Sequence, residues 1–137
     1  MFNGAVVTTK QKVPLSDFLL DKGFQLEQAD ENVVKIQREG ELPVFAHIND
    51  NILFFEVDLG NISEFSSTEL YFKMFDLNTE ILPVSLGIDS TNKNDPRLVL
   101  VESREVDNLD DNEVLSVLNA MELATDKVEE LLSNYIK

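Results

Sequence analysis

Residues 52–59, Ile-Leu-Phe-Phe-Glu-Val-Asp-Leu, decide the fold of this chain. Residues two apart in a β-strand point to the same face, and every second residue from Leu53 to Leu59 is apolar. The opposite face begins with Ile52 and Phe54 but ends with two acids. One end of the strand is therefore apolar on both sides. This pattern fits a central strand covered by a helix on each face, or a strand that presents one face to another chain.

Three shorter strand patterns precede this segment and are separated by short polar turns. They cover residues 24–28, 33–38 and 44–48. Such short connections are typical of antiparallel hairpins. A short helix before them is predicted to begin at Pro14, because proline suits a first helical turn. Gly23 marks its end.

A middle helix follows the long strand and carries more apolar side chains than one buried face needs. Ser66 and Glu69 have the spacing of a capping box, which predicts the start of this helix. A stripe at helical spacing then follows, formed by Leu70, Met74, Leu77 and Ile81 and widened by Tyr71 and Phe75. Phe72 lies on the opposite side. A surface helix requires only one such stripe, so this helix is either buried in the monomer or forms a contact with another chain.

The last third of the chain predicts two more strands and a long helix. The strands cover residues 82–88 and 97–106, and a polar loop joins them. Asp110 and Glu113 have capping-box spacing, and the helix runs towards Tyr135 with its acids on the outer face. We therefore expect an α+β fold, with a twisted antiparallel sheet of about five to six strands in the order α-β-β-β-β-α-β-β-α. Residues 14–137 form one domain, and residues 1–13 are expected to be a flexible tail.

Composition and charge exclude several classes of function. The net charge is −15 over 137 residues, yet 43% of the residues are hydrophobic. The chain therefore has enough apolar content to fold, and its negative surface disfavours nucleic acid and anionic lipid. No apolar run is long enough to insert into a membrane, and the N-terminus has no signal-peptide core. The absence of cysteine fits a reducing cytoplasm.

No motif predicts catalysis, a cofactor or a metal. The only histidine is His47, which is expected to be structural or exposed. Glu56 and Asp58 are paired carboxylates that could act in acid–base chemistry or bind a metal. The loop at residues 89–95 offers oxygen ligands but lacks the glycine and glutamate of a calcium-binding EF-hand, and a solvated turn explains it. We therefore expect that the protein is not an enzyme and that it has no cofactor and no metal site.

The order of elements resembles that of the small acidic chaperones of type III secretion, the class I or Tir-chaperone type. Four stretches carry the resemblance: residues 54–58, residues 69–78 with the sequence Glu-Leu-Tyr-Phe-Lys-Met-Phe-Asp-Leu-Asn, residues 83–88, and residues 98–109 with the helix that follows them. The chain also resembles the uncharacterised bacterial YjfI-like family, whose members sit near envelope-stress genes.

The resemblance implies a cytoplasmic bacterial homodimer, built around the middle helix, that binds an extended segment of a protein partner without using ATP. We expect the dimer or partner surfaces to use the apolar residues Phe54, Phe55, Leu70, Phe72, Met74 and Phe75. Two alternatives remain open. One is a YjfI-like regulatory protein linked to envelope stress, and the other is a metal-binding enzyme that uses carboxylates alone.

Overall fold

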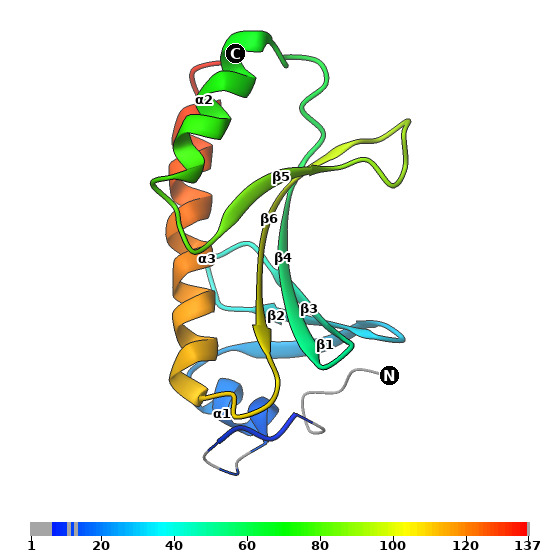
Figure 1. Ribbon diagram of the computed structural model, residues 1–137, viewed down its shortest axis with the longest axis vertical. Helices are drawn as coiled ribbons and strands as arrows, with labels where there is room; N and C mark the ends of the chain where they lie inside the picture. The colour runs from blue at the N-terminus through cyan, green and yellow to red at the C-terminus, as the bar shows by residue number, and fades with distance from the viewer. Residues whose placement is uncertain (1–6, 11, 13, 137) are drawn as a thin grey trace.

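The computed structural model describes all residues except 1–6, 11, 13 and 137. The described residues form one six-stranded antiparallel sheet and three helices (Figure 1). The elements are α1 (Leu15–Asp21), β1 (Gln25–Asp30), β2 (Val33–Gln37), β3 (Val44–Asn49), β4 (Ile52–Gly60), α2 (Thr68–Asn78), β5 (Ser85–Asp89), β6 (Arg97–Glu105) and α3 (Asp111–Leu132). The predicted fold class and element order are confirmed.

The strands lie in the order β1-β2-β3-β4-β6-β5, and every neighbouring pair is antiparallel. The longest pairing joins β4 to β6, from Ile52 opposite Glu105 to Gly60 opposite Leu98. The chain leaves β4, forms α2, and returns through β5 before β6 pairs with β4. As a result β5 becomes one edge of the sheet and β1 the other.

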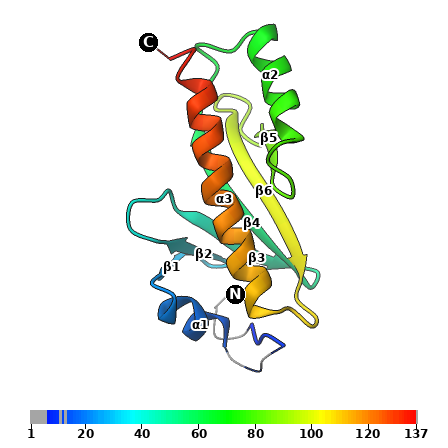
Figure 2. The same cartoon turned by 90° about the vertical axis from the view of Figure 1, so that its left-hand side faces the viewer.

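All three helices lie on the same face of the sheet (Figures 1 and 2). In β4, Leu53 and Phe55 are buried on that face, whereas Ile52 and Phe54 are half-buried on the other. The expectation of a helix on each face of β4 is therefore wrong. The open face tolerates solvent because polar side chains such as Lys35 and Ser103 lie among its apolar ones.

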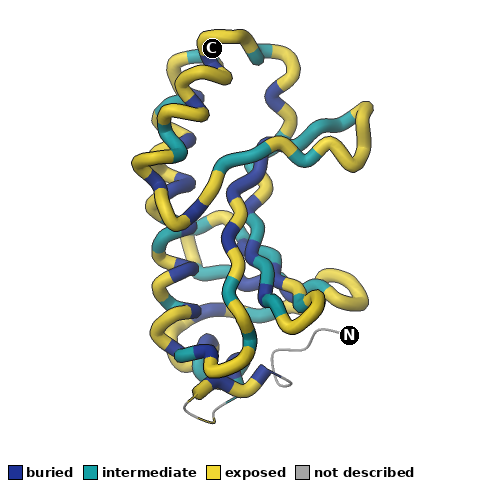
Figure 3. The backbone as a smooth tube through the Cα atoms, in the orientation of Figure 1, coloured by how far each residue is buried: buried dark blue, intermediate teal, exposed yellow. Residues whose placement is uncertain are grey.

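Buried residues of the sheet and of all three helices form the hydrophobic core, and Figure 3 marks where buried residues lie along the backbone. The stripe of α3 from Val114 to Leu132 is buried, as its helical spacing predicts. The capping box at the start of α3 is also confirmed. The Asp110 carboxylate accepts a hydrogen bond from the Asn112 backbone N–H at 2.8 Å, and the Glu113 carboxylate accepts one from the Asp110 N–H at 2.8 Å.

The start of α2 differs from the prediction by one residue. Ser67 is the N-cap, and its hydroxyl accepts a hydrogen bond from the Leu70 N–H at 3.1 Å. The Ser66 hydroxyl instead donates to the carbonyl of Ser63 at 3.2 Å. The predicted capping box between Ser66 and Glu69 is therefore wrong. Two adjacent serines could cap the helix, and Ser67 does so with an extended backbone and a hydroxyl bonded to the Leu70 N–H.

Part of the segment expected to be a tail packs on the domain. Val7 and Thr9 are buried, and the Leu15 N–H donates to the Val7 carbonyl at 2.8 Å. Val7 contributes to the hydrophobic core because this bond holds it beside the start of α1. The prediction of flexibility for residues 1–6, 11 and 13 lies outside the described residues.

Candidate partner-binding surface

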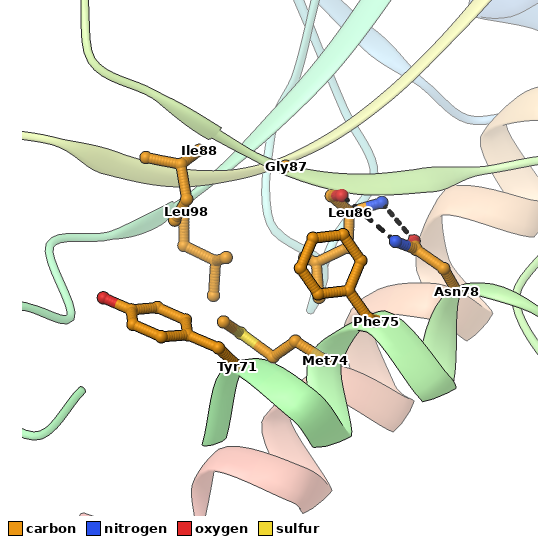
Figure 4. A pocket seen from close by; sticks show the side chains of 8 residues that line it. All are labelled: Tyr71, Met74, Phe75, Asn78, Leu86, Gly87, Ile88 and Leu98. Atoms are coloured by element: carbon orange, nitrogen blue, oxygen red, sulfur yellow. Dashed lines mark hydrogen bonds between the residues drawn. The ribbon is translucent and has the colours of Figure 1, made fainter. Parts of the chain in front are cut away.

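A small apolar pocket lies between α2 and the edge of the sheet. Its volume is about 150 Å³. Figure 4 shows the residues that line it, which are Tyr71, Met74, Phe75 and Asn78 of α2, Leu86, Gly87 and Ile88 of β5, and Leu98 of β6. A dry apolar cavity of about this size holds a molecule such as benzene. The pocket therefore has room for one large apolar side chain.

Exposed apolar side chains surround this pocket. Phe75 is 77% exposed, Ile88 is 48% exposed and Tyr71 is 42% exposed. Phe72 is 71% exposed on the adjoining side of α2. Contiguous exposed apolar surface of this kind marks interaction sites more often than scattered single residues do. We call Tyr71, Phe72, Phe75, Ile88 and the pocket between them the α2–β5 surface.

The side-chain amide of Asn78 fixes the end of α2 to the edge strand. Its oxygen accepts a hydrogen bond from the Leu86 N–H at 2.6 Å, and its nitrogen donates to the Leu86 carbonyl at 3.3 Å. These backbone groups of Leu86 therefore point away from β6. Alternate residues of an antiparallel strand point to the same edge, so the backbone groups of Ile88 also point towards the free edge of β5.

A second contact holds the first turns of α2 against the end of the chain. The Tyr135 hydroxyl lies 3.1 Å from a Glu69 carboxylate oxygen, and the Lys73 ammonium lies 3.2 Å from the same oxygen. Lys73 also lies over the Tyr135 ring, 5.8 Å from its centroid. The hydrogen bonds from Lys73 and Tyr135 lower the pKa of Glu69. With both ends anchored, α2 can present its outer aromatic side chains without a helix packed over them.

A family comparison assigns the chain. The sequence profile of the CesT_Tir_1 family, a family of type III secretion chaperones, matches residues 9–137. The chain belongs to the CesT_Tir_1 family. None of the curated proteins matches it. The resemblance to type III secretion chaperones stated from the sequence is confirmed.

Solved structures with the fold of this CesT_Tir_1 protein include type III secretion complexes. One is a chain of the heterodimeric ExoU–SpcU complex of Pseudomonas aeruginosa, with a TM-score of 0.67 and 16% identity over 84% of this chain and 94% of that one. Another is the Yersinia pestis secretion chaperone SycH in complex with a fragment of YscM2, with a TM-score of 0.52 and 16% identity over 87% and 94% of the two chains.

The same fold occurs in a protein described as a regulator. The Escherichia coli protein YbjN, a putative transcription regulator, aligns with a TM-score of 0.63 and 19% identity over 88% of this chain and 87% of YbjN. At these identities the likeness concerns the fold. Membership of this chaperone family points to a non-enzymatic role.

The structure separates the six residues that the sequence predicts for dimer or partner contacts. Phe55, Leu70 and Met74 are buried, so their side chains support the core, and Met74 also lines the pocket. Phe72 and Phe75 are exposed together on α2. Phe54 lies apart from them in β4, where it is half-buried and stacks on His47 with ring centroids 5.2 Å apart. Two of the six therefore reach the α2–β5 surface with exposed side chains.

Sequence reasoning missed the contribution of β5 and of Asn78 to this surface. Residues 82–88 were predicted as a half-buried strand, but only residues 85–89 form β5. Because β5 lies at the sheet edge, Ile88 pairs with Leu98 of β6 on one side and has no neighbouring strand on the other. Asn78 is the last residue of α2. Asparagine is common near helix ends, so its presence there does not indicate a further contact. No pattern in the sequence shows that its amide reaches Leu86.

The two carboxylates of β4 have different surroundings, because Glu56 is partly buried and Asp58 forms an ion pair. Burial, followed by the nearby charges of Asp89 and Asp58, raises the pKa of Glu56. Asp58 binds the Arg97 guanidinium at 3.2 Å. At the end of β5, Asp89 accepts hydrogen bonds from the Thr91 N–H at 3.0 Å and from the Thr91 hydroxyl at 2.6 Å. Among the residues the structure describes, no group of three or more His, Asp or Glu side chains could hold a metal ion.

No helix in the described part of the chain has the length and hydrophobicity needed to cross a membrane.

Proposed function

We propose that this CesT_Tir_1 protein is a small, acidic, chaperone- or adaptor-like module that holds a segment of a partner protein in the cytoplasm and performs no chemistry. The observation that carries the proposal is the α2–β5 surface. It combines an apolar pocket with exposed side chains of Tyr71, Phe75 and Ile88. A solved complex of SycH with a fragment of YscM2 has the same fold, which supports a protein ligand.

The pocket favours a segment that inserts one large apolar side chain. Apolar anchors in desolvated pockets contribute most of the affinity of many interfaces. Met74 and Leu98 form an apolar base, and Tyr71 and Phe75 stand beside it. Removing a rim side chain should therefore weaken binding without unfolding the protein, because Tyr71 is partly exposed and Phe75 is largely exposed.

We also propose that the protein is a homodimer and that Phe72 and Phe75 contribute to the contact between its subunits. Both side chains are more than two-thirds exposed, at 71% and 77%, and together they form an aromatic ridge on α2. A stable interface buries roughly 800 Å² on each partner, so the ridge would need further exposed apolar residues, such as Leu82 after the end of α2, to complete the contact. Leu82 is 69% exposed.

Sedimentation equilibrium tests the homodimer. The double variant Phe72→Asp, Phe75→Asp should shift the mass from dimer to monomer, because each subunit would place two charges against the other. Leu123→Asp is the matched control, since Leu123 is 66% exposed on the outer side of α3. A monomeric parent protein, or a double variant that dimerises unchanged, contradicts the proposed dimer.

Peptide selection tests partner binding. Extended peptides selected on the immobilised protein should carry a large apolar residue, and Ile88→Ser and Tyr71→Ser should weaken their binding more than Leu123→Ser does. Selected peptides that bind all three variants equally would contradict the proposed role of the α2–β5 surface. No described feature favours the envelope-stress regulator or the carboxylate-dependent enzyme over this function.

A further inference from the structure

A second apolar groove lies on the flank of α3, away from the α2–β5 surface. It has a volume of about 520 Å³. Leu42, from the connection between β2 and β3, and Leu59 of β4 line it together with Leu132 and Ile136 at the end of α3 and beyond. Leu42 is 41% exposed and Ile136 is 54% exposed. We call this the α3 groove.

One flank of α3 carries a row of carboxylates that begins at the α3 groove, and we call this row the acidic wall. Glu122, Asp126 and Glu129 are spaced four and three residues apart, so they lie along one flank of the helix. Glu129 lines the groove directly. The pKa of Glu41 is raised first by burial and then by the nearby charges of Glu122 and Asp126. The wall is therefore strongly negative beside an apolar floor.

Arg38 is a cation of this chain that already binds one carboxylate of this wall. Its guanidinium binds the Glu122 carboxylate at 2.6 Å and 3.0 Å, and the same group lies over the Phe24 ring, 4.6 Å from the centroid. Arg38 thus combines charge pairing with apolar contact at the first acid of the flank. In the described part of the chain, Asp126 and Glu129 form no such ion pair.

We infer that the α3 groove binds a cationic, amphipathic segment of a partner protein, whose basic side chains pair with Asp126 and Glu129 while an apolar side chain enters between Leu42 and Ile136. A second copy of this chain matches these carboxylates poorly, because its acidic residues outnumber its basic residues by 26 to 11, whereas the proposed subunit contact on α2 is apolar. The inference rests on the proposed function in that both assign a protein segment as ligand, but it names a separate site and a specific chemistry.

Fluorescence anisotropy with two labelled peptides tests the inference. The basic probe repeats the unit Leu-Arg-Arg-Leu, and the acidic control replaces each arginine with glutamate. The protein should bind the basic probe more tightly than the acidic one. Binding should weaken about tenfold in the double variant Asp126→Asn, Glu129→Gln, because two close charge pairs are lost. Leu42→Ser and Ile136→Ser should each weaken binding severalfold through loss of apolar contact.

A matched double variant separates the groove from overall charge. Glu31→Gln, Asp107→Asn removes one glutamate and one aspartate at exposed positions outside α3 that do not line the groove, so the net charge changes equally. It should alter binding by less than about twofold, as expected for distant surface charges. Equal weakening by the two double variants, or no binding of the basic probe, overturns the inference.

The α2–β5 surface provides the remaining control. Ile88→Ser should weaken binding of the basic probe less than Leu42→Ser or Ile136→Ser does. If Ile88→Ser abolishes binding and the groove variants do not, the cationic segment binds the α2–β5 surface. That result would overturn the α3 groove as a site while leaving the proposed function standing.

Discussion

The Asn78 side chain reproduces the hydrogen bonding of a neighbouring strand at Leu86, accepting from its N–H at 2.6 Å and donating to its carbonyl at 3.3 Å. This amide closes part of the free edge of β5 and fixes α2 beside the pocket. An unprotected edge strand readily pairs with other chains. Asn78 therefore serves both the position of α2 and the protection of the edge.

Asn78→Ala should destabilise the protein by about 1–2 kcal/mol, because two partly buried backbone groups lose their partner. Urea denaturation measures the change as a lower midpoint at unchanged slope. Asn94→Ala is the matched control, since Asn94 is exposed in the loop between β5 and β6 and should cost less than about 0.5 kcal/mol. Equal effects of the two substitutions would show that the Leu86 contact adds nothing to stability.

Adjacent phenylalanines in β4 should respond differently to truncation. Phe55 is 1% exposed beneath the helices, so Phe55→Ala should cost about 3–5 kcal/mol through lost burial and a cavity. Phe54 is half-buried on the open face against His47, and Phe54→Ala should cost clearly less. Chemical denaturation of both variants checks the difference. A larger loss of stability for Phe54→Ala than for Phe55→Ala would mean that Phe54, and not Phe55, faces the core.

Glu102 is a carboxylate whose burial should weaken the fold at neutral pH. Its side chain is almost fully buried on the helix-facing side of β6 and forms an ion pair with Arg104. Burial raises the pKa of Glu102, and the Arg104 charge offsets this only in part. The folded pKa lies above the unfolded one, so the ionised form is penalised in the folded state. The penalty is full above the raised pKa and disappears as pH falls below the ordinary carboxyl value.

Glu102→Gln should therefore raise the Tm at neutral pH by about 2–4 °C. The difference from the parent protein should vanish in acid, where Glu102 is already protonated. Thermal unfolding followed by circular dichroism over a pH series measures both effects. Glu105→Gln, at an exposed position of the same strand, is the control. A lower Tm of Glu102→Gln at neutral pH would mean that the ion pair with Arg104 outweighs the burial cost.

The cap of α3 gives a fourth prediction. The Asp110 carboxylate accepts from the Asn112 N–H, and Glu113 completes the capping box. Asp110→Ala should cost about 1 kcal/mol, the usual effect of losing an N-cap side chain. Asp107→Ala, three residues earlier at an exposed position, should change the urea midpoint little. A neutral Asp110→Ala would contradict a structural role for this cap.

The sequence predicted the elements well because their signals are local. Alternation marked the strand at residues 52–59, and acids at capping spacing marked α3. The arrangement of all helices on one face could not be predicted from β4 alone. Apolar residues such as Ile52 and Phe54 are compatible both with a helix that covers them and with partial exposure to solvent. Tertiary contacts between distant segments decided that question.

The candidate surface was predicted only in part for the same reason. Helical spacing identified excess apolar residues on α2 but did not distinguish Leu70, which is buried, from Phe75, which is exposed. That distinction depends on the angle at which α2 meets β5. The pocket itself required β5 to lie at the sheet edge, a consequence of β6 pairing with β4.

The central claim is that the α2–β5 surface holds a partner segment. The most direct measurement is the dissociation constant of a peptide selected on the parent protein, compared between that protein, Ile88→Ser and the exposed control Leu123→Ser. The account predicts a loss of about tenfold or more for Ile88→Ser, as expected for an apolar anchor contact, and no change for Leu123→Ser. Equal affinity of Ile88→Ser and the parent protein would contradict it.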